Sequence, residues 1–478
     1  MLRTKGFATV STSHPFPSKE RKKSGSLRTG GLVLVGIGGI IGAGFFLGCG
    51  VPIQAAGPAV LLSFLLGGLI TSQVTGALTS IATRHPVEGS FKVYADHYIG
   101  PFAGFMEGWV YYLTGVITIA SEAVAMGVFT KVWLPSLPLW ISSLAYSGII
   151  ILINAFGVRS FNRVESFMTV VKVAALVGFI VFAVLTITGV LHHASVQATS
   201  PTMTSYASPF FAHGFSGVMQ SMLVVIFAYA GIGVFATAAT KVDNPQTIER
   251  GAGLTVLVLT LLYIVSIALL LWIQPWQSIS TDTSPFVLAI RQHGVGWMSD
   301  LFNAAILIAS FSVMAGSVFS SAQILSSLGT AREAPAFVSK TSKRGVAYGA
   351  LLFTAVGIGC SIGAAYLLPA NVYNFLISAS SFMTFFYWVL MLWTFLRWRK
   401  TDEGKTSRAS LLAFAAPYGT WITIVFIIVL TAYALFDPSQ RIAFYAFLAI
   451  VVVLAVSYRF VSKSGKLTQG ASDPKEWS

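Results

Sequence analysis

Two ionisable residues lie inside long apolar stretches, where charge is costly. Lys172 stands between Val171 and Val173, and Glu122 follows Ile119-Ala-Ser. A lysine in a dry site can release its proton, and a carboxyl group can accept or relay one. We therefore expect Lys172 and Glu122 to carry protons, or to pair with each other. The alternatives are a lysine that extends to the membrane surface and a carboxyl group with a purely structural hydrogen bond.

A run of glycines interrupts the first apolar stretch. It reads Gly36-Ile-Gly-Gly-Ile-Ile-Gly-Ala-Gly44, with five glycines in nine residues. Each glycine costs a helix about 1 kcal/mol relative to alanine. An unwound segment here would free backbone N–H groups, which can hold a carboxylate together with the dipole of a half-helix. The alternative is close helix packing, because Gly38-x-x-x-Gly42 and Gly44-x-x-x-Gly48 are small-residue contact patterns.

A second apolar stretch has a similar interruption near its middle. It reads Phe227-Ala-Tyr-Ala-Gly-Ile-Gly233 and lies five stretches after the first. Interrupted segments at matching positions in two halves of a chain are typical of inverted-repeat transporters with a binding site at the membrane midplane. The two glycine breaks therefore favour a binding site over simple packing.

The elements that must position these residues are membrane helices. Of the 478 residues, 55% are hydrophobic and 10% are charged, far from the charge content of a soluble domain. The sequence predicts an all-α polytopic membrane protein with twelve transmembrane helices, because apolar runs of this length cross a bilayer and do not alternate as barrel strands do. The expected spans are 30–50, 59–83, 100–130, 138–156, 164–190, 214–240, 251–273, 298–329, 345–368, 372–397, 411–434 and 442–462.

The positive charges are distributed unevenly between the two sides of these spans. The chain has 30 lysines and arginines. Of these, 26 belong to the tails and loops on one side of the membrane, counting those at the adjoining span ends, and 3 belong to the loops on the other side. This bias predicts that both termini are cytoplasmic in a multi-pass plasma membrane protein. It also accounts for the net charge of +14 as topology and attraction to lipid, not as a nucleic-acid surface.

The expected organisation is a transporter core with short additions. Residues 1–29 read as a cytoplasmic tail, not a signal peptide, and 463–478 as a second tail. The core is 30–397, with inverted repeats at about 30–190 and 214–397, and 398–462 adds two helices after a cytoplasmic loop. No zinc-protease, serine-hydrolase or phosphate-loop motif is present. We therefore expect no enzyme activity, cofactor or metal, and His192 and His193 read as part of a polar loop.

Several motifs, in order along the chain, resemble the amino acid permeases of the amino acid–polyamine–organocation superfamily. They are Gly36 to Phe46, Ala56-Gly-Pro58, Gly89-Ser-Phe-Lys-Val-Tyr94, Gly100-Pro-Phe-Ala-Gly-Phe-Met-Glu-Gly-Trp109 and Lys241-Val-Asp-Asn-Pro245. The resemblance covers roughly 30–400. It implies a five-plus-five inverted repeat with broken helices 1 and 6, and an aromatic gate at Phe227. It implies that Lys172 stands where related carriers hold a sodium ion. It also implies a substrate site formed largely by the backbone, at Gly38, Ile40, Ile41, Gly42, Ala43, Gly44, Phe227, Tyr229, Ala230, Gly231 and Gly233.

The chain departs from the family at Gly233, where a glutamate is common, and this favours a neutral amino acid. We expect proton-coupled import of amino acids by alternating access, with amino acid, protons and lipid as partners. An exchanger, a cationic amino acid permease, a channel and a non-transporting sensor are the alternatives. The sequence carries no signal for oligomeric state.

Hydroxyl groups in the expected eighth span could serve helix packing or the rim of a polar cavity. They belong to Ser310, Ser312, Ser317, Ser320 and Ser321. As further lining residues we expect Ser310, Phe311, Ser121 and Ser381. Glu107, near the start of the third span, is expected at the membrane interface.

Overall fold

The computed structural model describes residues 29–87, 89–156, 161–191, 209–233, 235, 244–342, 345–367 and 372–463. The expected tails apart from their boundary residues Thr29 and Lys463, as well as Lys241 and the histidine pair at 192–193, lie outside these residues. Within them, every regular element is a helix. Nine helices of the described part are long and apolar enough to cross a membrane, and three shorter apolar helices accompany them. The all-α polytopic fold is confirmed at this level.

The first apolar stretch forms a chain of short helices. These are α1 (Thr29–Ile40), α2 (Ala43–Phe46) and α3 (Gly50–Ala56), followed by η1 (Gly57–Ala59) and the long α4 (Val60–Ala82). Helix α1 ends because Gly42 takes an extended conformation, with φ −146° and ψ −158°. The break is therefore narrower than the glycine run and is centred on Ile41 and Gly42.

The next segment contains the long helix that borders the site. Its helices are α5 (Ser90–Tyr98), α6 (Pro101–Thr130), α7 (Leu139–Ala155) and α8 (Phe161–Ile187). Gly100, with φ +138°, separates α5 from α6, and Pro101 then begins the new helix. Proline suits this first helical position because the N–H group that it lacks would have no partner inside the helix.

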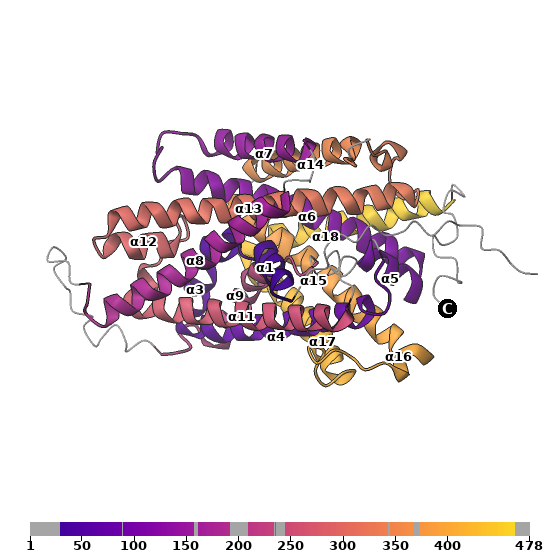
Figure 1. Cartoon of the computed structure of the whole chain (residues 1–478), viewed down its shortest axis with the longest axis horizontal. Coiled ribbons are helices and arrows are strands. Elements are labelled where there is room, and N and C mark those ends of the chain that lie inside the picture. The colour runs from indigo at the N-terminus through magenta and orange to yellow at the C-terminus, as the bar shows by residue number, and fades with distance from the viewer. Residues whose placement is uncertain are drawn as a thin grey trace, which may run out of the picture.

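The helices in the second half of the core follow an order of lengths similar to that in the first half. It contains α9 (Gly214–Tyr229), α11 (Pro245–Ile273), η4 (Trp276–Ser278), α12 (Pro285–Gln292), α13 (Gly296–Thr330), η5 (Ala336–Ser339), α14 (Tyr348–Leu367) and α15 (Val372–Trp398). A short helix again precedes the longest one. Figure 1 shows α5 and α12 at opposite ends of the molecule.

Helix packing follows the same order in both halves. Helix α1 contacts α11 and α8, and α9 contacts α4 and α15. Helix α8 contacts α13, and α15 contacts α6. Helices α6 and α13 pack against each other in the middle of the fold, and α7 and α14 lie together beside them (Figure 1). The broken helices are thereby enclosed by α6, α8, α13 and α15.

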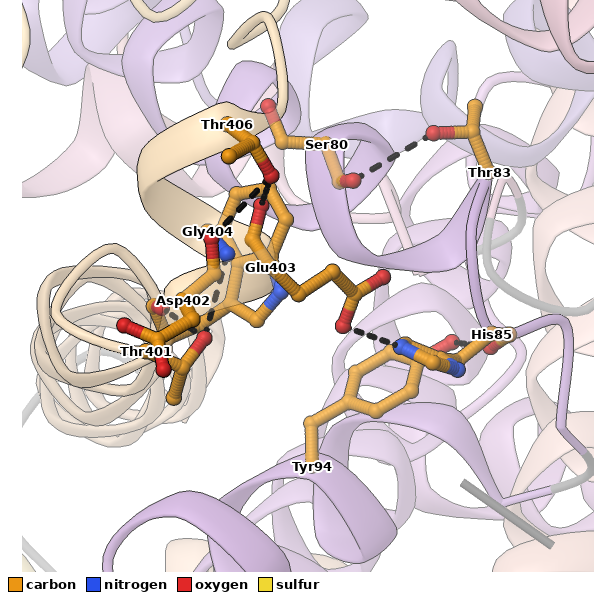
Figure 2. A network of polar contacts seen from close by, with 10 residues as sticks. Ser80, Thr83, His85, Tyr94, Thr401, Asp402, Glu403, Gly404 and Thr406 are labelled. Carbon is orange, nitrogen blue, oxygen red and sulfur yellow. Dashed lines mark hydrogen bonds and ion pairs between the residues drawn. The ribbon is translucent and has the colours of Figure 1, made fainter. Parts of the chain in front are cut away.

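The last elements are α16 (Asp402–Thr406), α17 (Tyr418–Tyr433), η6 (Ala434–Phe436) and α18 (Pro438–Lys463). Helix α16 is tied to the end of α4, as Figure 2 shows. The Glu403 carboxylate lies 3.0 Å from Nε2 of His85. The Tyr94 hydroxyl donates to the backbone oxygen of His85, and the Ser410 N–H donates to Ser80 Oγ at 2.9 Å. These contacts fix the loop between α15 and α17 on the core.

Candidate functional site

The break after α1 is held by two buried ionisable side chains. Glu122 of α6 accepts a hydrogen bond from the Ala43 N–H at 3.0 Å, and Lys172 of α8 donates one to the Gly38 oxygen. Their exposed fractions are 2% and 0%. Unwound backbone inside a membrane protein needs such partners, because unpaired groups there are costly. The burial also rules out a Lys172 that extends to the membrane surface.

Helix α8 presents one polar face to this break. Glu165, Thr169 and Lys172 are spaced by four and three residues, which places them on one side of a helix. A methyl group on Gly38 would lie 2.3 Å from Thr169 Oγ1 and 3.0 Å from Glu165 Oε1. Ser312 donates to the same Glu165 oxygen at 2.8 Å. The lysine therefore stands near two carboxyl groups, Glu122 and Glu165, with which it interacts electrostatically.

The break after α9 touches the first one. Helix α9 ends at Tyr229, and Ala230 is extended with ψ 150°. Gly231 has φ +113°, a conformation that side chains rarely adopt. A methyl group there would lie 2.6 Å from the Gly39 carbonyl oxygen. Glycine is required at 231 because the two unwound segments meet backbone to backbone.

A cavity of about 80 Å³ lies where the two breaks meet. The broken segments contribute Gly39, Ile40, Gly44, Phe227, Ala230 and Gly231 to its wall. At roughly 15 Å³ for each enclosed water, the space holds about five waters. It is therefore of a size for the polar end of a small solute, and it lies beside backbone N–H and carbonyl groups.

The remaining wall comes from helices α6, α13 and α15. The α6 residues are Tyr111, Thr114, Gly115, Thr118 and Glu122, the α13 residues are Val313, Gly316, Ser317, Ser320 and Ser321, and α15 gives Tyr387. Most of these were not predicted individually. The α6 residues follow helical spacing back from Glu122, and the serines belong to the hydroxyl group noted in the sequence, so a periodicity signal was present.

The predicted residues divide into three groups. Ile40, Gly44, Phe227, Ala230, Gly231 and Glu122 lie in the cavity wall. Gly38, Ile41, Gly42, Ala43 and Lys172 lie at the α1 break, behind that wall, where a methyl group on Gly42 would meet Glu122 Oε1 at 2.5 Å. The third group, Tyr229 and Gly233, lies outside that wall. Tyr229 is fully buried, and its hydroxyl donates to the Phe64 oxygen at 2.9 Å.

The weaker lining candidates also lie outside the cavity wall. Ser121 donates to the Thr118 oxygen at 2.8 Å, and Ser381 donates to the Ile377 oxygen at 2.7 Å. These hydroxyls are satisfied within their own helices. Ser310 is fully buried near Glu122, and Phe311 is partly exposed.

Gly233 has a structural partner that the sequence did not reveal. A methyl group on this residue would lie 2.3 Å from the hydroxyl oxygen of Tyr111. Tyr111 therefore fills the space into which a longer side chain at 233 would extend. The phenol also lines the cavity, so α6 supplies a polar group beside Gly233.

A larger cavity of about 540 Å³ adjoins the first on the side of α5. The two cavities share Tyr111 and Ser320 in their walls. The larger one, which we call the vestibule, is bordered by α5, α13 and the segment before α14, and Gln323 and Ser327 are among its polar lining residues.

The opposite side of the small cavity is packed with aromatic rings. Phe45 stacks on Tyr263 with ring centroids 3.9 Å apart, and it lies 5.3 Å from the ring of Phe286 on the short helix α12. Phe46 and Phe302 continue this packing at 5.8 Å. The two sides of the cavity therefore differ, with an open vestibule on one and dense aromatic packing on the other.

Glu107 has an environment that the sequence did not predict. It was expected at the membrane interface, and its side chain is fully buried within the protein. Neither carboxyl oxygen has a hydrogen-bond partner among the described residues. Helix α5 and the segment after α13 cover this end of α6, which hydropathy alone does not reveal.

Comparison with known proteins identifies the chain's relatives. A family model described as amino acid permease matches residues 31–469. The aromatic amino acid transport protein AroP of Escherichia coli K12 is 30% identical over 94% of this chain and 97% of its own length. The uncharacterized transporter YcgH of Bacillus subtilis is 31% identical over 95% of this chain and 99% of its own length.

These matches confirm the resemblance drawn from the motifs. They cover nearly the whole chain, including the broken helices and the helices that enclose the cavity. Combined with the apolar helices, they settle the class of protein: the chain belongs to the amino acid permease family and is an integral membrane protein.

Proposed function

We propose that the chain is a secondary transporter that imports neutral amino acids across the plasma membrane by alternating access, coupled to protons. The observation that carries this proposal is the cavity at the meeting point of two broken helices, with Lys172 and Glu122 at the first break. Half-helix ends and unwound backbone at such a point can bind both charged ends of an amino acid.

The proposed topology has twelve crossings, in a five-plus-five inverted repeat with both termini cytoplasmic. Helices α1, α4, α6, α7 and α8 would correspond to α9, α11, α13, α14 and α15. Under this correspondence the α1–α11 contact maps onto α9–α4, and the α8–α13 contact onto α15–α6. The positions of α5 and α12 at opposite ends of the molecule support the inversion (Figure 1).

The amino acid would bind by its backbone groups. Its carboxylate would meet backbone N–H groups at the start of α2, near Gly44, in competition with Glu122, which accepts from the Ala43 N–H. Its ammonium meets carbonyl oxygens at the end of α1, near Gly39 and Ile40. Phe227 lies against Gly44, where a methyl group would be 2.7 Å from its ring, so this ring can close over the bound molecule.

The side chain of the substrate would lie between α6 and α13. The described wall there carries hydroxyl groups, glycines and the Tyr111 and Tyr387 rings, and Glu122 is its only carboxyl group. Glu122 accepts from the Ala43 N–H and lies near the Lys172 ammonium, so a cationic side chain would have to compete for the one carboxyl group of this wall. The AroP relatives are named for aromatic amino acids, which are therefore the first neutral substrates to test.

The proton would act through the first break. Lys172 holds the Gly38 carbonyl and stands near Glu122 and Glu165. Loss of a proton from Lys172 removes the positive charge from the hydrogen bond that fixes the end of α1. The geometry of the binding backbone would thereby depend on protonation, which is what coupling requires.

The alternating-access cycle would use the two unlike sides of the cavity. The vestibule is on the side of α5, which the charge bias assigns to the cytoplasm, and the aromatic packing would separate the site from the outside. The structure is thus interpreted as an inward-facing state. Opening outward would separate the Phe45 and Phe286 rings and close the vestibule.

Uptake by proteoliposomes tests this function directly. Purified protein should give counterflow of a labelled neutral amino acid and accumulate it under an inward proton gradient. Counterflow without accumulation would support an exchanger instead. Substrate binding without any counterflow would support a non-transporting sensor, and uptake that does not saturate would support a channel.

A further inference from the structure

Glu107 continues the line of cavity residues along α6. The α6 residues in the cavity wall recur every three or four residues, as one face of a helix requires. They are Tyr111, Thr114, Gly115, Thr118 and Glu122. A further step of four from Tyr111 leads to Glu107 on the same helix face. Glu107 lies about 22 Å along the helix from Glu122, at the vestibule end.

The Glu107 carboxyl group is buried without a partner. Its side chain has no exposed area, and neither oxygen accepts or donates a hydrogen bond among the described residues. A carboxylate in this state loses its hydration and gains nothing in return, so the group takes up a proton. Fully buried acidic residues without a partner are rare in proteins, which makes the presence of Glu107 informative.

A buried ion pair lies near Glu107. Lys92 of α5 approaches Gly108, where a methyl group would lie 3.2 Å from its side chain, but its ammonium pairs with Glu333 at 3.0 Å. Both members of that pair are less than a tenth exposed. The other titratable groups on elements packed near this end of α6 include Tyr94, Asp96, His97 and Tyr98 of α5, Tyr111 and Tyr112 of α6, Arg332 after α13, Tyr387 of α15 and Tyr458 of α18.

A layer of aromatic rings separates Glu107 from the two cavities. Phe91 of α5 stacks on Tyr111 with centroids 5.1 Å apart, and Tyr387 of α15 lies 5.5 Å from Tyr111. Glu107 is close enough to interact electrostatically with the Tyr387 phenol. Tyr111 lines both cavities, and Phe91 lines the vestibule, so movement of these rings would open a route from Glu107 to water.

We propose that Glu107 is a second proton-binding site, from which a transported proton passes to the vestibule when the Phe91, Tyr111 and Tyr387 rings move apart. The proton leaves the carboxyl group for water in the vestibule, and the carboxylate is reprotonated from the substrate cavity. This inference rests on the proposed proton-coupled transport and gives it a release group on the cytoplasmic side.

The test compares Glu107→Gln with Glu333→Gln in proteoliposomes made from the full chain. Glutamine keeps the shape of the acid but cannot release a proton. Wild-type uptake should fall as the pH on the vestibule side falls, approaching roughly tenfold per pH unit below the titration midpoint. Glu107→Gln should flatten this dependence while counterflow persists, and Glu333→Gln should keep it.

An infrared titration provides a second readout that needs no transport. A protonated carboxyl group has its own carbonyl band, and one such band should be present in the wild type and missing in Glu107→Gln. If the glutamine variant fails to fold, Glu107→Asp should keep the band and the pH dependence at a changed midpoint.

The proposal would be overturned if the pH dependence of uptake were unchanged in Glu107→Gln. It would also be overturned if the wild type showed no carbonyl band of a protonated carboxyl group that Glu107→Gln removes. Equal flattening in Glu333→Gln would also overturn it, by assigning the effect to the Lys92 pair. Absence of counterflow in the wild type would instead reject the transport function, and the infrared titration would then still decide whether Glu107 holds a proton.

Discussion

Replacing Gly231 by alanine tests whether the contact between the two broken helices forms the binding site. The new methyl group would lie 2.6 Å from the Gly39 carbonyl oxygen, whereas ordinary contacts begin near 3.4 Å. The two segments must therefore separate by about 0.8 Å, the difference between these distances. Alanine at φ +113° adds backbone strain of order 1–3 kcal/mol.

This separation should affect substrate more than folding. A displacement of about 1 Å in a positioning element can cost roughly 100-fold in function. We expect Gly231→Ala to weaken binding of the best amino acid about 10- to 100-fold, as measured by scintillation proximity with labelled substrate. A smaller loss in thermal stability should accompany it, because the strain is confined to one unwound turn.

Gly359→Ala is the matched control. Gly359 lies in α14, and a methyl group there has no neighbour within 4 Å. Alanine is the better helix former by about 1 kcal/mol, so this variant should bind normally and be at least as stable as the wild type. Wild-type affinity in Gly231→Ala would mean that the meeting of the two breaks does not form the substrate site.

Three further substitutions probe other parts of the site. Lys172→Ala should abolish accumulation under a proton gradient but leave counterflow, and undiminished gradient-driven uptake would reject its coupling role. Gly42→Leu places a side chain 2.5 Å from Glu122 Oε1 and 2.9 Å from Val313, so it should remove substrate binding in a protein that still folds, as checked by size-exclusion chromatography and thermal shift. Tyr229→Phe removes the hydrogen bond to the Phe64 oxygen and should cost about 1 kcal/mol of stability. Its substrate affinity should stay within about threefold of wild type, and a larger loss in a folded variant would place Tyr229 in the site.

The sequence predicted the broken backbone and its ionisable partners for reasons that are local. Glycine clusters such as Gly36 to Gly44 are expensive in a helix wherever they occur, and Lys172 and Glu122 are conspicuous because their neighbours are apolar. These signals do not depend on how helices pack. They therefore identified the first break without any knowledge of the tertiary structure.

The cavity wall depended on helix rotation and long-range packing. Tyr229 is the last residue of α9, directly before the second break, but its side chain turns to Phe64, whereas Tyr111 comes from α6 and reaches Gly233. Glu107 is buried because α5 folds back over α6, a contact that composition does not encode. Which side of a wholly apolar helix faces a cavity is decided by its neighbours.

Determination of a structure of the full chain in lipid nanodiscs, with a saturating amino acid chosen by a thermal-shift screen, would show whether the substrate binds where the two broken helices meet. We expect density for the amino acid between Gly39–Gly44 and Phe227–Gly231, with its carboxylate toward the start of α2 and its side chain between α6 and α13. Density confined to the vestibule, with both broken segments ordered and unoccupied, would contradict this expectation.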